Sequence, residues 1–193
     1  DEATAYALAV VRGEEMAGPV VRDGAMRHLK DLKHGHERGL FWSLPHVERV
    51  LKFFRQILRL NGGEFEGKPF DPLPWQCFIL GSLFGWMKLE PGVTYRETTL
   101  LDPDDILDLC EAGQAYRRFR VAYQETGKGS GKSPLAAGIG LYMMLADNEP
   151  GAECYVAAAD REQAGLNYQA AAAMVRANAS LSRRLQCLDS RKR

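Results

Sequence analysis

The sequence lacks the features that mark several classes of protein. Its cysteines, Cys77, Cys110, Cys154 and Cys187, form no CxxC pair, which argues against a zinc ribbon or a dithiol redox centre and favours reduced thiols in an intracellular protein. Its apolar runs end well short of the roughly 18 residues that a membrane-spanning helix needs, and its start has no signal-peptide pattern. We therefore expect a protein that is neither secreted nor bound to a membrane.

The sequence also has no excess of charge of either sign. Its 25 Lys and Arg residues balance 25 Asp and Glu residues, so the overall charge provides no attraction to a polyanion. A contact with nucleic acid would need a local basic patch, for which a solvated face and tail is the alternative interpretation. Two basic clusters are candidates, namely Arg117, Arg118 and Arg120, and then Arg183, Arg184, Arg191, Lys192 and Arg193.

The character of the 193-residue chain changes near residue 116. Residues 1–115 have mainly helical patterns, and residues 116–193 have the order strand, loop, helix, strand, helix. That order predicts an α/β fold with a parallel sheet, here an incomplete βαβα unit preceded by a mainly helical N-terminal region. Helices are expected at 19–33, from Ser43 to Asn61, at 75–87, from near Pro103, at 134–146 and after Asp160, and strands at 118–124 and 153–159.

A glycine-rich loop lies between the first predicted strand and the helix that follows it. Residues 127–133 read Gly-Lys-Gly-Ser-Gly-Lys-Ser. Glycines allow successive backbone N–H groups to turn toward phosphate oxygens, and a helix that starts at the loop adds unpaired N–H groups and the positive end of its dipole. Lys132 is placed to reach the β- and γ-phosphates, and the hydroxyl of Ser133 is placed to ligate Mg²⁺. The loop thus predicts an ATP·Mg²⁺ site.

This loop departs from the usual phosphate-binding pattern at its first position. The full pattern has a glycine where this sequence has Thr126. The alternative interpretation is a flexible basic turn between two elements.

Several motifs, in the same order along nearly the whole chain, resemble the large terminase subunit of tailed bacteriophages. Around the loop they are Phe119-Arg120-Val121-Ala122-Tyr123-Gln124-Glu125-Thr126 and the later Leu135-Ala136-Ala137. Downstream they are Glu149-Pro150-Gly151-Ala152-Glu153-Cys154-Tyr155, Ala158-Ala159-Asp160-Arg161 and Gln163-Ala164. Upstream they are Arg27-His28-Leu29-Lys30-Asp31-Leu32, Pro74-Trp75-Gln76 and Phe84-Gly85-Trp86.

The resemblance implies a P-loop ATPase of a variant type that lacks the first glycine of the loop. In this sequence Thr126 stands at that position. The resemblance also implies that Lys128 takes the place of a basic residue early in the loop, often Arg, and that Gln76 recognises adenine through its carboxamide. The implied catalytic residues are Lys132, Ser133 and Lys128. The implied nucleotide-binding residues are Gln76, Thr126, Gly127, Lys128, Gly129, Ser130, Gly131, Lys132 and Ser133. From the residues alone, Trp75 and Gln76 indicate a helix start near the core.

The resemblance further implies a motor that couples ATP hydrolysis to the translocation of double-stranded DNA into a capsid. Its partners would be a portal protein, a small terminase subunit and further copies in a ring, in the cytoplasm of an infected bacterium. Residues 1–115 would carry the adenine-side motif, and residues 116–193 would be the first part of the ATPase core. A second acidic motif and a nuclease would lie beyond residue 193.

An acidic motif that ends an apolar strand in Asp-Glu is not found near the loop. Tyr155 to Asp160 superficially fits, but Arg161 stands in place of the glutamate, and we interpret Asp160 as a helix cap with Gln163 at the reciprocal position. This chain alone is then expected to bind ATP without turnover. A P-loop kinase acting on a small molecule and a nucleotide-binding module without hydrolysis are the alternative functions.

Overall fold

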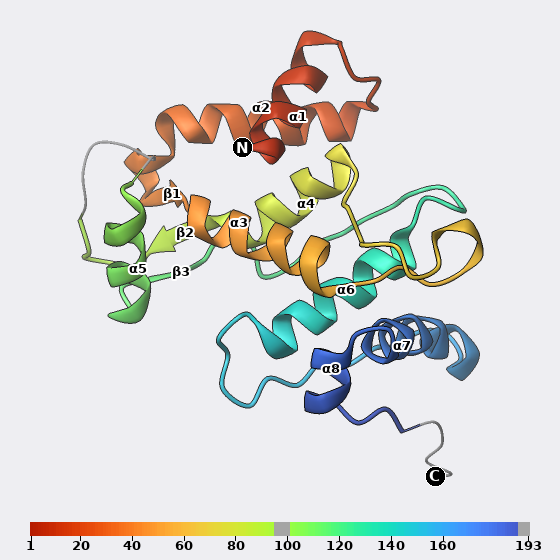
Figure 1. The fold of residues 1–193 in the computed structure, drawn as a ribbon. Coiled ribbons are helices and arrows are strands. Elements are labelled where there is room, and N and C mark those ends of the chain that lie inside the picture. The colour runs from red at the N-terminus through yellow and green to blue at the C-terminus, as the bar shows by residue number, and fades with distance from the viewer. Residues whose placement is uncertain (95–100, 189–193) are drawn as a thin grey trace. The chain divides into compact units, whose positions relative to one another are not determined.

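The computed structural model describes residues 1–94 and 101–188, and its contacts divide the chain into two compact units (Figure 1). The first unit consists of Asp1–Leu51 and Pro72–Tyr123, and the second of Lys52–Asp71 and Gln124–Arg193. This grouping reflects contacts in the folded chain. The predicted boundary between residues 115 and 116, drawn from composition, stays a prediction.

The first unit is mainly helical. Its elements outside the sheet are α1 (Glu2–Arg12), α2 (Pro19–His34), the short 3₁₀ helix η1 (Gly35–Arg38), α3 (Leu44–Lys52), α4 (Pro74–Gly85) and α5 (Pro103–Glu111). Four of these helices carry proline in their first turn, where no backbone N–H is needed. The carboxylate of Asp1 accepts from the N–H of Thr4 at 3.0 Å and so caps α1.

A small antiparallel sheet completes the first unit. Its strands are β1 (Leu40–Trp42), β2 (Trp86–Leu89) and β3 (Ala115–Arg117), in the order β1-β2-β3. Trp42 lies opposite Trp86 in the register of β1 and β2. Helix α5 covers part of this sheet, because Ile106 packs in one buried cluster with Phe41 and Met87.

Glycines allow α4 to approach its neighbours in the first unit closely. A Cβ atom at Gly85 would lie 2.4 Å from Cγ2 of Val47, and one at Gly81 would lie 2.6 Å from Cβ of Ala3. Trp42 fills the adjacent space, with its Cη2 atom 3.2 to 3.3 Å from both of those positions. The core of this unit therefore depends on the absence of side chains at two positions of α4.

The second unit combines an early segment of the chain with its C-terminal part. Its elements are the π-helical turn η2 (Phe53–Ile57), the 3₁₀ turn η3 (Gly63–Phe65), α6 (Lys132–Leu145), α7 (Arg161–Arg176) and α8 (Ala179–Arg184). Ring contacts tie the early segment to itself and to α6, with centroids of Phe54 and Phe70 5.0 Å apart and those of Phe53 and Tyr142 5.5 Å apart. The side chain of Asn178 donates to the carbonyl of Ile57 at 2.8 Å.

The predicted parallel sheet is not present among the described residues, whose one sheet is antiparallel. The predicted strands at 118–124 and 153–159 have no strand structure. Val121, Tyr123 and Tyr155 are 87%, 88% and 86% exposed, whereas strands of a parallel sheet are buried on both faces. The alternating and apolar patterns identified segments able to pair, but a strand also needs a hydrogen-bonding neighbour.

The predicted helices are largely confirmed, with corrected ends. The helix expected at 19–33 is α2, the one near Pro103 is α5, and those expected at 134–146 and after Asp160 are α6 and α7. The helix expected from Ser43 to Asn61 ends earlier, because a π turn follows Lys52 and Leu58 then has an extended backbone. The helix expected at 75–87 ends at Gly85, since Trp86 and Met87 belong to β2.

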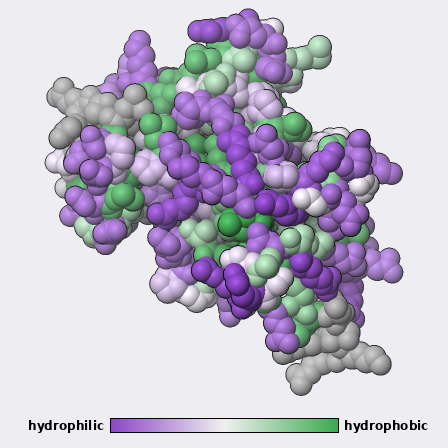
Figure 2. Space-filling view, in the orientation of Figure 1, coloured by the Kyte–Doolittle hydropathy of each residue, from purple (hydrophilic) through white to green (hydrophobic). Residues whose placement is uncertain are grey.

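Polar and charged residues are spread over the face drawn in Figure 2, with apolar residues in smaller groups between them. Among the described residues, no helix combines the length and the apolar character that crossing a bilayer requires.

Candidate nucleotide site

The glycine-rich loop leads directly into α6, as the sequence predicted. Gly129 and Gly131 have φ values of +85° and +78°, a backbone region that residues with a side chain rarely adopt. Gly131 is the N-cap of α6, and its carbonyl accepts the first helical hydrogen bond from Leu135 at 3.1 Å. Glycine at these two positions is thus what lets the chain turn into the helix here.

The backbone N–H groups of the loop are available to a ligand. Residues 128 and 129 form a hydrogen-bonded turn, and within the described part of the chain the N–H groups of Gly131, Lys132 and Ser133 donate to no carbonyl or side-chain oxygen. Unpaired N–H groups at the start of a helix, together with the helix dipole, favour an anion. The loop therefore has the donors that a chain of phosphates requires.

Two side chains of the loop bond to its own carbonyl groups. The hydroxyl of Ser130 donates to the carbonyl of Gly127 at 2.8 Å, which closes the turn. The ammonium group of Lys132 lies 3.4 Å from the carbonyl oxygen of Thr126 and 3.5 Å from that of Gly127. The hydroxyl of Thr126 is buried and has no hydrogen-bond partner among the described residues. Lys132 thus lies across the loop and must exchange these carbonyls for a phosphate if it binds one.

The structure brings together the predicted loop residues, from Thr126 to Ser133, at the N-terminus of α6. Lys128 is exposed in the middle of the loop, and Ser133 is half-buried in the first turn of the helix. A serine hydroxyl is a hard oxygen ligand of the kind that Mg²⁺ accepts alongside phosphate oxygens and water. The residues present therefore fit the predicted magnesium site.

Gln76, the predicted adenine-recognition residue, belongs to the first unit, whereas the loop belongs to the second. Its side chain is buried at 3% exposure, and its Oε1 atom accepts from the backbone N–H of Leu73 at 2.9 Å. This hydrogen bond stabilises the N-terminus of α4. The contact favours the helix-start interpretation of Gln76, and its adenine role stays a prediction.

Asp160 has the role of a helix cap, as predicted. Its Oδ1 atom accepts from the backbone N–H of Gln163 at 2.8 Å at the start of α7. The carboxylate is exposed.

Arg117, Arg118 and Arg120, the first basic cluster that the sequence offered as a DNA contact, contact aromatic and acidic side chains of their own unit. The guanidinium of Arg117 lies 4.8 Å from the ring centroid of Phe84, and that of Arg120 lies 5.3 Å from that of Tyr116. In the second cluster, Arg183 and Arg184 are exposed in the last turn of α8. Arg191, Lys192 and Arg193 lie outside the described residues.

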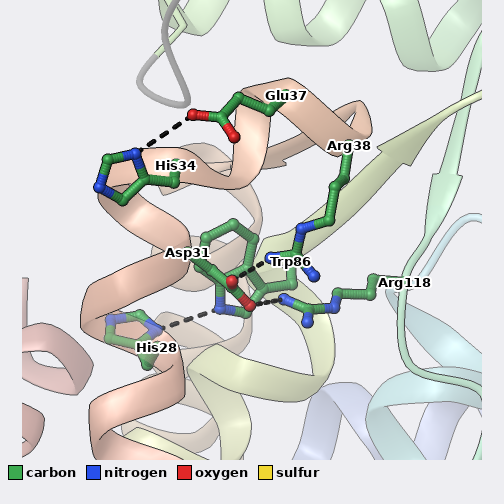
Figure 3. Close-up of polar contacts among 7 residues, drawn as sticks. All are labelled: His28, Asp31, His34, Glu37, Arg38, Trp86 and Arg118. Carbon is green, nitrogen blue, oxygen red and sulfur yellow. Dashed lines mark hydrogen bonds and ion pairs between the residues drawn. The ribbon is translucent and has the colours of Figure 1, made fainter.

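Arg118 belongs to a buried polar network that the sequence analysis did not find (Figure 3). Its guanidinium forms an ion pair of 2.7 Å with Asp31, whose side chain is 2% exposed and also pairs with Arg38. It lies 5.3 Å from the ring centroid of Trp86 as well. Asp31 and His28 are three positions apart on α2, a spacing that puts both on one helix face. This spacing of His28 and Asp31 is the signal in the sequence from which the network could have been predicted.

The comparisons with known proteins agree with the resemblance found in the sequence. Residues 110–193 match the family model described as "Terminase large subunit, ATPase domain". The matched region includes the glycine-rich loop, α6 and α7. No curated protein and no solved structure matches the chain. The match of residues 110–193 confirms the resemblance to the terminase large subunit that the sequence indicated.

Proposed function

We propose that this chain is the ATP-binding part of a viral DNA-packaging motor. The observation that carries the proposal is the set of unpaired loop N–H groups at the N-terminus of α6, next to Lys132 and Ser133. The match of residues 110–193 to the terminase ATPase-domain model, a range that includes the loop, supports the proposal. A loop of this kind binds the phosphates of a nucleotide through many weak donors at once.

In the proposed complex, each loop residue has a separate part. The N–H groups of Gly129 and Gly131 bind phosphate oxygens, and Lys132 leaves the carbonyls of Thr126 and Gly127 to neutralise the β- and γ-phosphates. The hydroxyl of Ser133 would hold Mg²⁺, which would supply positive charge to offset the negative charge that develops during phosphoryl transfer. Lys128 adds a second positive charge beside the γ-phosphate, without the planar fork that an arginine would bring.

The remaining parts of the proposal concern the assembled motor. Several copies would form a ring and act on double-stranded DNA at a portal protein, with a small terminase subunit as a further partner. The nuclease activity implied by the resemblance would belong to residues outside this chain. Because no described residue is assigned the water-positioning role, we expect this chain alone to bind MgATP with slow or no turnover.

The test is a calorimetric titration of the chain with MgATP, compared with the Lys132→Ala variant. Loss of a charge-assisted hydrogen bond costs about 1.5 to 3 kcal/mol, so we expect an affinity roughly 10- to 100-fold lower. Lys68→Ala is the matched control: it removes a lysine of the same unit whose ammonium group lies 5.3 Å from the ring centroid of Phe65, in a segment separate from the glycine-rich loop. Equal affinities of wild type and Lys132→Ala would refute the proposed phosphate site.

The same protein distinguishes the two alternative functions. Transfer of phosphate from ATP to an added small acceptor, without DNA, would favour a kinase. Stoichiometric binding without turnover, even in a longer protein that includes the acidic motif, would favour a nucleotide-binding module.

A further inference from the structure

Helix α6 lies on the early segment of the second unit through a close backbone contact. A Cβ atom at Gly138 would lie 2.7 Å from Cε1 and Cζ of Phe54 and 2.9 Å from Cδ1 of Leu58. Both of these side chains are 0% exposed, so neither can move into solvent to make room. The ring of Phe54 therefore rests against the backbone of α6 at a position where only glycine fits.

The early segment that carries Phe54 is itself held in place by several contacts. Phe54 lies in the π-helical turn η2, and its ring packs against Phe70 with centroids 5.0 Å apart. The N–H of Phe70 donates to the carbonyl of Leu58 at 3.1 Å, and an ion pair of 2.7 Å joins Arg55 to Asp71. Residues 52–71 thus provide a firm support for α6.

The contact lies close to the candidate phosphate site along the same helix. Gly138 follows Lys132 by six positions on α6, which corresponds to about 9 Å along the helix axis. An α-helix is stiff over this length, so a shift of its backbone at Gly138 also moves the N–H groups at its start. Phe54 fixes the position of α6 at Gly138, and the N-terminus of the same helix carries the loop.

We propose that Phe54 and Gly138 are positioning residues, which hold α6 so that its N-terminus presents the loop N–H groups to phosphate. This inference rests on the proposed function and names how an early part of the chain, outside the region that matches the family model, supports the nucleotide site. In the proposed role, Phe54 acts through α6. The π turn serves this role by placing the two neighbouring rings of Phe53 and Phe54 on buried sides of the unit.

The test is a set of variants titrated with MgATP by calorimetry. Gly138→Ala should weaken the affinity about 5- to 30-fold, because the added methyl forces α6 away from Phe54. Gly140→Ala is the matched control on the same helix, since a Cβ there meets nothing within 4 Å. Both changes raise helix propensity equally, so a difference between them reports the contact alone.

A rescue variant separates positioning from a general loss of stability. Phe54→Leu replaces the ring that the new methyl group would meet with a shorter side chain. The double variant Gly138→Ala/Phe54→Leu should bind MgATP closer to wild type than either single variant does. Losses that simply add in the double variant, or an affinity of Gly138→Ala equal to that of Gly140→Ala, would overturn the proposal. If Gly138→Ala does not fold, recovery of folding and MgATP binding in the double variant supports the contact, and failure to recover contradicts it.

A second measurement needs no nucleotide. The amide resonances of Gly129, Gly131 and Ser133 should shift in Gly138→Ala and stay in place in Gly140→Ala. Unmoved loop amides in Gly138→Ala would contradict the positioning role even where MgATP binding is intact. Conversely, a wild-type chain that binds no MgATP while its loop amides respond to Gly138→Ala would refute the nucleotide site and leave the mechanical coupling in place.

Discussion

The indole N–H of Trp86 donates to Nδ1 of His28 across a buried distance of 3.0 Å. An indole nitrogen is a donor only, so Nδ1 of His28 must be the acceptor and its proton must be on Nε2. That second nitrogen lies 3.1 Å from the hydroxyl of Thr4, which in turn donates to Asp1 at 3.0 Å. The network therefore requires His28 in its neutral form.

The first prediction concerns the pH dependence of stability. Burial lowers the pKa of His28 from 6.5 to about 4, against the opposing effect of Asp31 and with smaller contributions in the same direction from Arg118 and Arg27. Below pH 6.5 the unfolded chain takes up a proton that the folded chain refuses, so stability falls between pH 6.5 and pH 4. The loss amounts to something on the order of 3 kcal/mol.

Urea unfolding at several pH values between 7 and 4 measures this loss. In His28→Gln the steep part of the pH dependence should disappear, while in His34→Gln, whose ring is exposed beside Glu37, it should remain. A His28→Gln variant with the wild-type slope would show that His28 does not carry the effect.

The second prediction compares the two arginines that pair with Asp31. The side chain of Arg118 is 15% exposed and that of Arg38 is 56% exposed. Arg118→Gln should lower the free energy of unfolding by about 2 to 3 kcal/mol, because the buried carboxylate of Asp31 loses the positive charge of Arg118, with which it pairs. Arg38→Gln should cost less than about 1 kcal/mol, because solvent screens an exposed pair. Equal costs in urea unfolding would contradict this ranking.

The third prediction separates the two interpretations of Gln76. Gln76→Met keeps the volume and removes the oxygen that accepts from Leu73. The unfolding free energy should fall by about 1 kcal/mol, since the backbone N–H of Leu73 loses the acceptor that caps α4. The ratio of MgATP to MgGTP affinity should stay constant. A selective loss of MgATP affinity would instead confirm adenine recognition by this residue.

The fourth prediction concerns Asp160. Asp160→Ala should destabilise the chain by about 1 kcal/mol through loss of the cap on α7, and Asp160→Asn, which preserves a capping oxygen, should cost little. Neither change should alter the affinity for MgATP. A strong loss of Mg²⁺-dependent binding in Asp160→Asn would show that Asp160 serves the nucleotide instead.

The sequence alone located helices α2 to α7 and the glycine-rich loop, because these depend on local chemistry, but it did not indicate α1 or α8. Proline at first turns, the capping side chain of Asp160 and the glycines before Lys132 act within a few residues of their own position. The same local signals led to the resemblance that the match of residues 110–193 confirms. The order of motifs along the chain was enough for that conclusion.

Only the tertiary structure decided which segments pair and which remain single. The alternating stretch at 118–124 and the apolar one at 153–159 have the composition of strands, yet the described sheet joins β1, β2 and β3 instead. The contact of Phe54 with Gly138 and the pairing of Asp31 with Arg118 join residues more than eighty positions apart. No local pattern encodes such contacts, because strand pairing and core packing depend on partners brought together only when the whole chain folds.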